Sequence, residues 1–427
     1  MPLLILGYLV CYIDRSAISV AGLTMNESLG LTATQFGLGI GIFYLTYVAL
    51  EVPSNVILYK VGARKWLARI MISWGLVTLA MAAIQGPGSL YLTRLLLGAA
   101  EAGFAPGILW YLTRWYPIKI RIGALTIFGA GTALAPLVGS PLGGLLLRLD
   151  GIFGLEGWRW LFIVEAIPAF IVGILFLSFL PDDPRRAAWL PRANRDWIVD
   201  QLSQESSAIE KRYSGRVRGA FTNPVVIILS LVFFLFAANS TGLTMWMPLV
   251  IQGTFGEPTT GQVTLLAAIP GLIGVLGMVV VSKSVKRFGH EMLHLSVILS
   301  TCGVLVALSV MAGPNPLGFV LLVVGAGAAF SVGPVIWQIA GRYITGVAAA
   351  AGFALINSVG GAAGFGIPYL IGAVKDATGS FSIPLYVVAA ALFAASLVAQ
   401  LLRFLPDPAA RGVSHPDSAE MVQDRQA

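Results

Sequence analysis

The segment PDDPRRAAWLPRANRDWIVDQLSQESSAIEKRYSGRVRGAFT, residues 181–222, is the one long polar interruption in an otherwise apolar chain. Six apolar runs precede it and six follow, each of about the length at which a helix crosses the hydrocarbon core of a membrane. The runs are 2–23, 36–58, 66–85, 88–112, 122–147 and 158–180, then 223–251, 262–282, 291–311, 316–341, 345–373 and 381–404. The pattern predicts an all-α membrane protein with twelve transmembrane helices in two six-helix halves.

The composition excludes an ordinary water-soluble domain. Of 427 residues, 57% are hydrophobic and 11% are charged, whereas a soluble domain has about 25% charged residues. There are 27 Lys and Arg residues against 20 Asp and Glu, a net charge of +7. In so apolar a chain this excess is typical of positively charged loops that orient a protein in the membrane, rather than of a nucleic-acid-binding surface. The expected partners are therefore the lipid bilayer and a small molecule, with no nucleic acid.

A short repeat relates the two halves. FLPDDP (Phe179–Pro184) ends the sixth run and FLPDP (Phe404–Pro408) ends the twelfth, as expected of two parallel repeats about a pseudo-two-fold axis along the membrane normal. The predicted parts are an amino-terminal bundle (1–180), a cytoplasmic linker (181–222), a carboxy-terminal bundle (223–404) and a cytoplasmic tail (405–427). The linker's apolar residues fit either one side of a short surface helix or a solvated loop; they are Trp189, Leu190, Ile198 and Leu202.

The distribution of Lys and Arg predicts the orientation. These residues concentrate on alternate connections, namely 60–69, 114–121, 181–222, 283–287 and Arg342. The opposite connections carry only Arg148, Arg159 and Lys375. Because cytoplasmic loops hold the excess of positive charge, both termini are predicted to be cytoplasmic in a multi-pass protein of the plasma membrane.

Four charged residues interrupt the apolar runs of the first half. Asp14 and Arg15 lie near the middle of the first run, and Arg94 and Glu101 are seven residues apart in the fourth, on one face of a helix. Such charges are costly in hydrocarbon and are usually functional. A buried guanidinium binds a carboxylate, and a buried acid takes up and releases a proton. The alternative is that the four residues only pair with one another to hold the bundle together.

Further polar groups lie deep in the runs. Tyr44, Tyr47 and Glu51 share one face of the second run. The tyrosines either donate hydrogen bonds to a substrate or pack against a neighbouring helix. For Glu51, a structural hydrogen bond to a neighbouring helix or loop is favoured. The second half contributes large neutral polar groups for the far end of a substrate or for hydrogen bonds between helices; they are Asn239, Trp337, Gln338 and Asn357.

The sequence predicts no metal site, no cofactor and no catalytic residue. Cys11 and Cys302 both lie inside apolar runs and are expected to be small packing residues. His290 and His294 share a helical face but have no obvious third ligand. A nucleophile with an adjacent base, which a membrane enzyme needs, is not evident, and neither is the continuous polar path that a channel needs.

Several longer motifs resemble the major facilitator superfamily, and within it the anion:cation symporter family, whose bacterial members take up tartrate, phthalate, galactonate and other sugar acids or organic acids. The motifs are YIDR (Tyr12–Arg15), TMNESLGL (Thr24–Leu31), YVALEVPSN (Tyr47–Asn55), GARKWLARIMISWG (Gly62–Gly75), RLLLGAAEAGFAPG (Arg94–Gly107), GWRWLFIVEAIPA (Gly157–Ala169) and ALINSVGGAAGF (Ala354–Phe365). The resemblance covers nearly the whole chain. It implies the major facilitator fold, alternating access, a monomer in the bacterial inner membrane, and no enzymatic activity.

The resemblance also implies roles for individual residues. Arg15 resembles the arginine that binds the substrate carboxylate, with Tyr12 and Tyr47 beside it. Glu101 resembles the acid whose protonation is coupled to transport, Asp14 a second proton carrier, and Arg94 the basic partner of that acid. Trp337 and Asn357 resemble the carboxy-terminal contribution to substrate recognition. The coupling ion is then the proton, and the expected function is proton-coupled uptake of an organic anion, such as a sugar acid, a tartrate-like diacid or an aromatic acid.

The sequence departs from the superfamily pattern at its gating motifs. Tyr59 stands where the loop after the second run usually has aspartate, and the loop with Lys286 and Arg287 also lacks one. The chain starts without the basic arm that commonly precedes the first helix, so either its start lies upstream or the arm is absent. A proton-independent exchanger or an exporter of the same superfamily is the alternative function.

Overall fold

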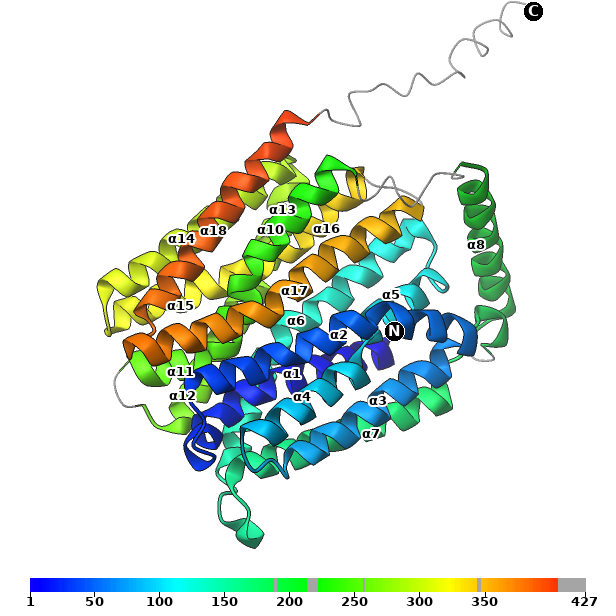
Figure 1. Cartoon of the computed structure of the whole chain (residues 1–427). Helices are drawn as coiled ribbons and strands as arrows, with labels where there is room; N and C mark the ends of the chain where they lie inside the picture. Colours follow the sequence, from blue (N-terminus) through cyan, green and yellow to red (C-terminus); the bar gives the residue numbers. More distant parts are fainter. Residues whose placement is uncertain (188–189, 213–221, 256–257, 344–346, 406–427) are drawn as a thin grey trace, which may run out of the picture.

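A computed structural model describes residues 1–187, 190–212, 222–255, 258–343 and 347–405, and within these it contains helices and no strand. The amino-terminal helices are α1 (Pro2–Ser28), α2 (Ala33–Val61), α3 (Ala63–Met81), α4 (Pro87–Glu101), α5 (Phe104–Thr113), α6 (Ile118–Leu147) and α7 (Gly157–Phe179). The carboxy-terminal helices are α10 (Pro224–Ala237), α11 (Thr244–Thr254), α12 (Thr260–Leu266), α13 (Ile269–Phe288), α14 (Glu291–Ala312), α15 (Pro316–Ala328), α16 (Val332–Tyr343), α17 (Val347–Thr378) and α18 (Ser382–Gln400). The long helices run side by side in one bundle (Figure 1).

Each of the twelve predicted runs coincides with helix in the described residues, which confirms an all-α membrane fold. Ten of the described helical stretches are long and apolar enough to cross a membrane. The other two runs correspond to α3, which begins with Arg64 and Lys65, and to α6.

Four of the predicted runs are not single helices, which the apolar pattern did not reveal. The fourth run is divided at Gly103 into α4 and α5, and the eighth is divided at Ala267 and Ala268 into α12 and α13. The seventh contains a π-helical turn (Ala238–Leu243) just before Pro248, and the tenth a 3-10 turn (Ala329–Ser331) just before Pro334. A proline has no N–H for the carbonyl four residues earlier and clashes with it, so the preceding turn changes its hydrogen bonding.

The linker contains helix α8 (Arg192–Arg212), so of the two alternatives the described part adopts the surface helix. Ile198 and Leu202 are half-buried on it, and Trp189 lies outside the described residues. The start of α1, helix α8 and the end of α18 lie at the same end of the bundle (Figure 1).

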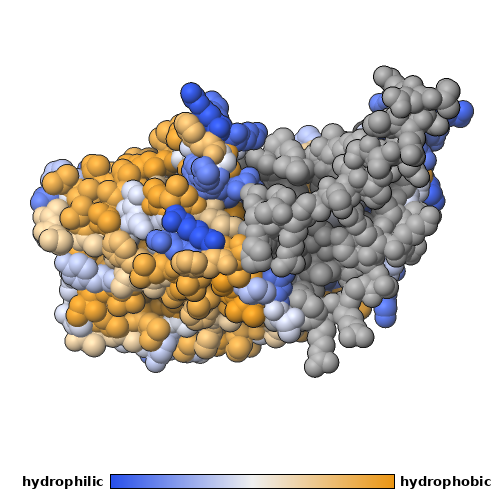
Figure 2. Space-filling view, turned by 90° about the horizontal axis from the view of Figure 1, so that it is seen from above, coloured by the Kyte–Doolittle hydropathy of each residue, from blue (hydrophilic) through white to orange (hydrophobic). Residues whose placement is uncertain are grey.

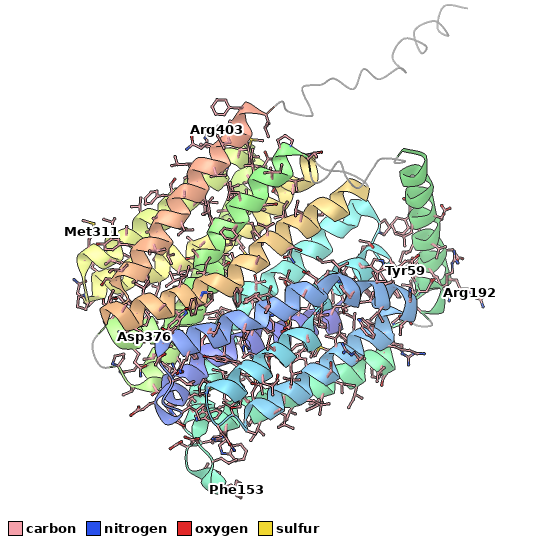
Figure 3. The ribbon with its side chains drawn as sticks, viewed as in Figure 1. Tyr59, Phe153, Arg192, Met311, Asp376 and Arg403 are labelled. Carbon is pink, nitrogen blue, oxygen red and sulfur yellow. The ribbon has the colours of Figure 1, made fainter. Side chains whose placement is uncertain are left out.

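The pairing of α2 with α17 is the most extensive contact between residues before 181 and residues after 222. At Gly41 the helices are so close that a Cβ would meet the backbone oxygen of Phe365. Asp376 at the end of α17 accepts hydrogen bonds from the backbone N–H groups of Ala33 (3.0 Å) and Thr34 (2.7 Å), the first residues of α2. Figure 3 shows Asp376 at this end of the pair and Tyr59 of α2 at the opposite end.

The outer surface suits lipid. Large apolar side chains such as Val280 (66% exposed) and Leu397 (67% exposed) face outward, and Figure 2 shows a face on which apolar residues predominate. Burying such side chains against lipid tails rather than water removes the cost of their exposure. Charged side chains lie instead at the helix ends, on α8, in the loops and at a few interior positions.

Candidate functional site

Arg15 lies at the centre of a buried polar cluster in the amino-terminal helices. Its Nε donates to Oε1 of Glu101 on α4, and the side chains are 12% and 0% exposed. Cys11, one helical turn before Arg15, donates its thiol to the same oxygen at 2.9 Å. The cysteine is buried, as a packing residue would be, and it also orients the carboxylate.

An aromatic cage surrounds the Arg15 guanidinium. Its Cζ lies 4.7 Å from the ring centre of Tyr47, 5.3 Å from that of Tyr12 and 5.4 Å from that of Phe43. Ring faces are electron-rich and attract a desolvated cation. Nη2 of Arg15 and Oε2 of Glu101 are both buried and have no hydrogen-bond partner among the described residues. The cluster therefore leaves one strong donor and one strong acceptor available.

Glu101 is the last residue of α4, and the chain positions it by breaking the helix. Ala102 has extended backbone angles and Gly103 has a φ of +87°, a conformation that glycine adopts without a Cβ clash. Ser54 of α2 packs directly against Gly103, where a Cβ would collide with it. The break fixes the Glu101 carboxylate in the bundle interior beside α1.

Asp14 and Arg94 are buried beside this cluster but have other partners. Asp14 is 4% exposed and accepts from the hydroxyl of Thr78 on α3 at 2.8 Å. Arg94 is 3% exposed and donates through Nε to the backbone oxygen of Gly39 on α2 at 3.1 Å. Its Cζ lies 4.9 Å from the ring centre of Phe43, so this ring contacts both arginines.

Trp337 and Asn357 are the two site residues predicted in the carboxy-terminal helices, and among the described residues neither contacts Arg15 directly. Trp337 lies between Phe233 and Phe353, with ring centres 5.6 and 5.8 Å away. Asn357 of α17 donates its amide to Oε1 of Glu51 on α2 at 3.0 Å. Glu51 thus makes the structural bond that the sequence favours, and its partner is a residue predicted to bind substrate.

A small cavity of about 30 Å³ lies between α1, α6 and the α11–α13 region. Its polar lining consists of hydroxyl groups, and the remainder is apolar. The hydroxyls belong to Ser16, Ser19, Ser140 and Thr244, and the apolar lining includes Pro136, Met245, Met247, Pro270 and Phe330. Ser16 follows Arg15 in the sequence, but adjacent positions of a helix point about 100° apart, and no residue of the arginine cluster lines this cavity.

Sequence reasoning singled out Tyr12, Arg15, Tyr47 and Glu101, which the fold brings into one cluster. It did not assign a site role to Cys11, Phe43, Thr78 or Glu165. The four-residue spacings Cys11–Arg15 and Phe43–Tyr47 are a signal that would have found two of them. Glu165 is an acid inside an apolar run, so the rule that selected Glu101 applies to it equally.

Comparison with known proteins agrees with the fold and with transport. The sequence profile described as "Major Facilitator Superfamily" matches residues 4–368. A protein of Agrobacterium vitis named as a tartrate transporter is 40% identical over 94% of this chain and 89% of its own length. The "Quinolone resistance transporter" of Acinetobacter baumannii is 38% identical over 90% of this chain and 89% of its own.

Solved structures show the same fold. The crystal structure of a D-xylose-proton symporter superimposes with a TM-score of 0.74 at 16% identity, over 95% of this chain and 97% of the other. A nucleoside transporter, NupG, gives a TM-score of 0.67 over 94% of this chain and 98% of the other. The helices, the buried charged cluster and these similarities together show that the chain belongs to the major facilitator superfamily of membrane transporters.

Proposed function

We propose that the protein takes up a small organic anion together with protons. The observation that supports this is the Arg15 guanidinium, which is held in an aromatic cage with Nη2 unpaired among the described residues. An arginine presents parallel N–H groups that match a carboxylate in two-point hydrogen bonding. A substrate carboxylate would take the position of the Glu101 oxygen on Nε and occupy Nη2 as well.

Competition for Arg15 provides the coupling. Glu101 in its ionised form is bound to Arg15 through Oε1, so a substrate anion must displace it. Protonation of Glu101 removes its charge and releases the guanidinium to the substrate. Deprotonation restores the Arg15–Glu101 pair and expels the anion, so the proton and the substrate bind together. This difference in affinity between the two protonation states is what a coupled transporter requires.

The same proposal includes the arrangement in the membrane. Residues 1–180 and 223–404 would rock against each other around the Arg15 cluster, with α2 and α17 as the shared surface. Both termini would be cytoplasmic, in a bacterial inner membrane, and the chain would act as a monomer. Trp337 and Asn357 would reach the substrate as the halves close on it, Asn357 by exchanging its bond to Glu51.

The cavity favours a hydroxylated acid. Its polar lining consists of hydroxyl groups of α1, α6 and α11, and hydroxyls both donate to and accept from alcohol groups. The relative from Agrobacterium vitis is named for tartrate, a dicarboxylic acid with two hydroxyl groups. Tartrate is therefore the first substrate to test, followed by galactonate and benzoate as a sugar acid and an aromatic acid.

The test is uptake of radiolabelled tartrate, galactonate and benzoate by proteoliposomes, with and without an inward proton gradient. Gradient-driven accumulation of one acid is expected for the wild type. Arg15→Ala should lose both accumulation and exchange, and Glu101→Gln should keep exchange but lose gradient-driven accumulation. Arg403→Ala and Glu27→Gln, at exposed positions, serve as matched controls. Wild-type behaviour of Arg15→Ala and Glu101→Gln would refute the proposal.

Export is a second candidate, because a relative of similar identity is named as a quinolone resistance transporter. A quinolone drug also carries a carboxylate, so Arg15 would serve either function. The discriminating measurement is ciprofloxacin accumulation in cells that express the protein. Reduced accumulation that requires Arg15, without gradient-driven uptake of any organic acid in proteoliposomes, would favour export.

A further inference from the structure

Glu165 of α7 is a buried acid outside the arginine cluster. Its side chain is 5% exposed, and Oε2 has no hydrogen-bond partner among the described residues. A carboxylate without a cation or donor is strongly disfavoured inside a membrane protein. Burial without a partner therefore favours the neutral, protonated form of Glu165, which would store a proton in the bundle interior.

The helix register places Asp14 and Thr78 at the level of Glu165. On α1, Gly7 packs against Val172 and Phe176 of α7, while Val20 and Leu161 both pack against Gly143. The two helices are thus antiparallel, and Asp14, midway between Gly7 and Val20, lies opposite the turn that contains Glu165. On α3, Gly75 packs against Ala166 and Ala169, which puts Thr78 at the same level.

Few other charged groups face this position. On α1 the charged residues at this level are Asp14 and Arg15, and Arg15 is paired with Glu101. The basic residues of α3 lie in its first two turns, and Arg159 of α7 binds Glu156 and the backbone at Ala82. The described part of α6, residues 131–147, has no titratable side chain.

The partners of the buried charged groups indicate which of Asp14 and Glu165 holds a proton. Arg15 is neutralised by Glu101, and the buried Arg94 donates to the backbone oxygen of Gly39 and contacts the ring of Phe43. Asp14 has a hydrogen-bond donor in Thr78, whereas Oε2 of Glu165 has no partner among the described residues. Two carboxyl groups that lie close together favour one shared proton, because like charges in a poorly polarisable interior repel strongly.

We propose that Glu165 and Asp14 form a second proton-binding pair of the transport cycle, in which Glu165 holds the proton at rest. The step is a transfer from the Glu165 carboxyl to the Asp14 carboxylate, which leaves Glu165 ionised and Asp14 neutral. Asp14 then releases this proton to one side of the membrane and Glu165 takes up another from the opposite side, which restores the resting pair. The Thr78 hydroxyl already binds Asp14 and lies on the path. This inference rests on the proposed function and adds one proton to the one carried by Glu101.

The experiment measures proton stoichiometry from the reversal of labelled tartrate flux in proteoliposomes at set pH gradients and membrane potentials. The wild type should couple two protons to each substrate, and Glu165→Gln one. Glu27→Gln is the matched control. An unchanged stoichiometry in Glu165→Gln would overturn the inference, because Glu165 would then be a neutral acid with a purely structural role that glutamine can fill.

A second measurement needs no substrate. The pH-difference infrared spectrum of the purified protein should contain a carboxylic C=O band that shifts in D₂O and is absent in Glu165→Gln. A spectrum identical to that of the wild type would contradict a proton on Glu165. Because glutamine resembles a protonated glutamate, Glu165→Gln should fold; failure to fold while Glu165→Asp folds would likewise refute the assignment.

The two proposals fail in different ways. If Glu101→Gln keeps full gradient-driven accumulation, the proposed function is wrong whatever Glu165 does. If Glu101→Gln is uncoupled but Glu165→Gln matches the wild type in both stoichiometry and spectrum, only the second proton site is wrong.

Discussion

Removal of the Arg15 side chain should abolish substrate binding, but the single variant is a poor test. Arg15 is the ion-pair partner of Glu101, whose carboxylate is fully buried. Loss of one member of a buried pair leaves an uncompensated charge, which costs about 3–5 kcal/mol. Arg15→Ala therefore combines loss of the substrate contact with general destabilisation.

The Glu101→Gln background separates the two effects. With a neutral amide at position 101, Arg15→Ala no longer leaves an unpaired carboxylate. In Glu101→Gln the guanidinium offers both Nε and the unpaired Nη2 to a substrate carboxylate. Two hydrogen bonds to a charged group contribute about 1.5–3 kcal/mol each, and about 1.4 kcal/mol is tenfold in affinity. The double variant should bind roughly 10²- to 10⁴-fold more weakly than Glu101→Gln.

The assay is equilibrium binding of labelled tartrate, or of the acid identified by uptake, to purified protein in detergent. The affinity of Arg15→Lys in the Glu101→Gln background should fall between that of Glu101→Gln and that of the double variant with Arg15→Ala, because lysine keeps the charge but not the planar pair of donors. Thermal unfolding of each variant checks that the fold persists. Binding by the double variant within threefold of Glu101→Gln would show that Arg15 is not the substrate's anchor.

Three further predictions concern the surroundings of the site. Asp376→Asn removes the negative charge at the start of α2, an exposed interaction of about 0.3–1 kcal/mol; electron-paramagnetic-resonance distances across this end should show a larger open population, and an unchanged distribution would show that Asp376 does not help to hold α2 against α17. Gly41→Val places a side chain against the Phe365 backbone, so overpacking should cost about 1–3 kcal/mol, measured as a lower unfolding temperature that Gly41→Ala shows to a smaller degree. Phe43→Leu removes the ring that contacts Arg15, which should weaken substrate binding roughly two- to fivefold from a cation–π contribution of about 0.5–1 kcal/mol; equal affinities would assign the ring to packing alone.

The sequence predicted most of the fold because each transmembrane helix is encoded locally. A run of about 20 apolar residues specifies a membrane helix without reference to the rest of the chain. The same reasoning selected Arg15 and Glu101, since a charge in an apolar run stands out from its neighbours. It could not pair them, because they are 86 residues apart and nothing local encodes which helices meet.

The interruptions of the helices escaped prediction for a related reason. Gly103 lies within an apolar run that reads as continuous helix, and its positive φ depends on the close approach of Ser54 from α2. The bond between Asn357 and Glu51 joins residues 306 positions apart, and only the packing of α2 against α17 makes it possible.

The sequence by itself determined that the chain is an all-helical membrane protein of two six-helix halves, with a few costly charges in the first half. The reason is that hydrophobicity and buried charge are properties of single segments. The tertiary structure decided which partners those charges have. Arg15 pairs with Glu101 while its Nη2 has no partner, Asp14 accepts a hydrogen bond from Thr78, and Oε2 of Glu165 is unpaired among the described residues. These outcomes depend on which helix faces which, and in a membrane that choice is made by close packing and polar pairing between segments distant in sequence.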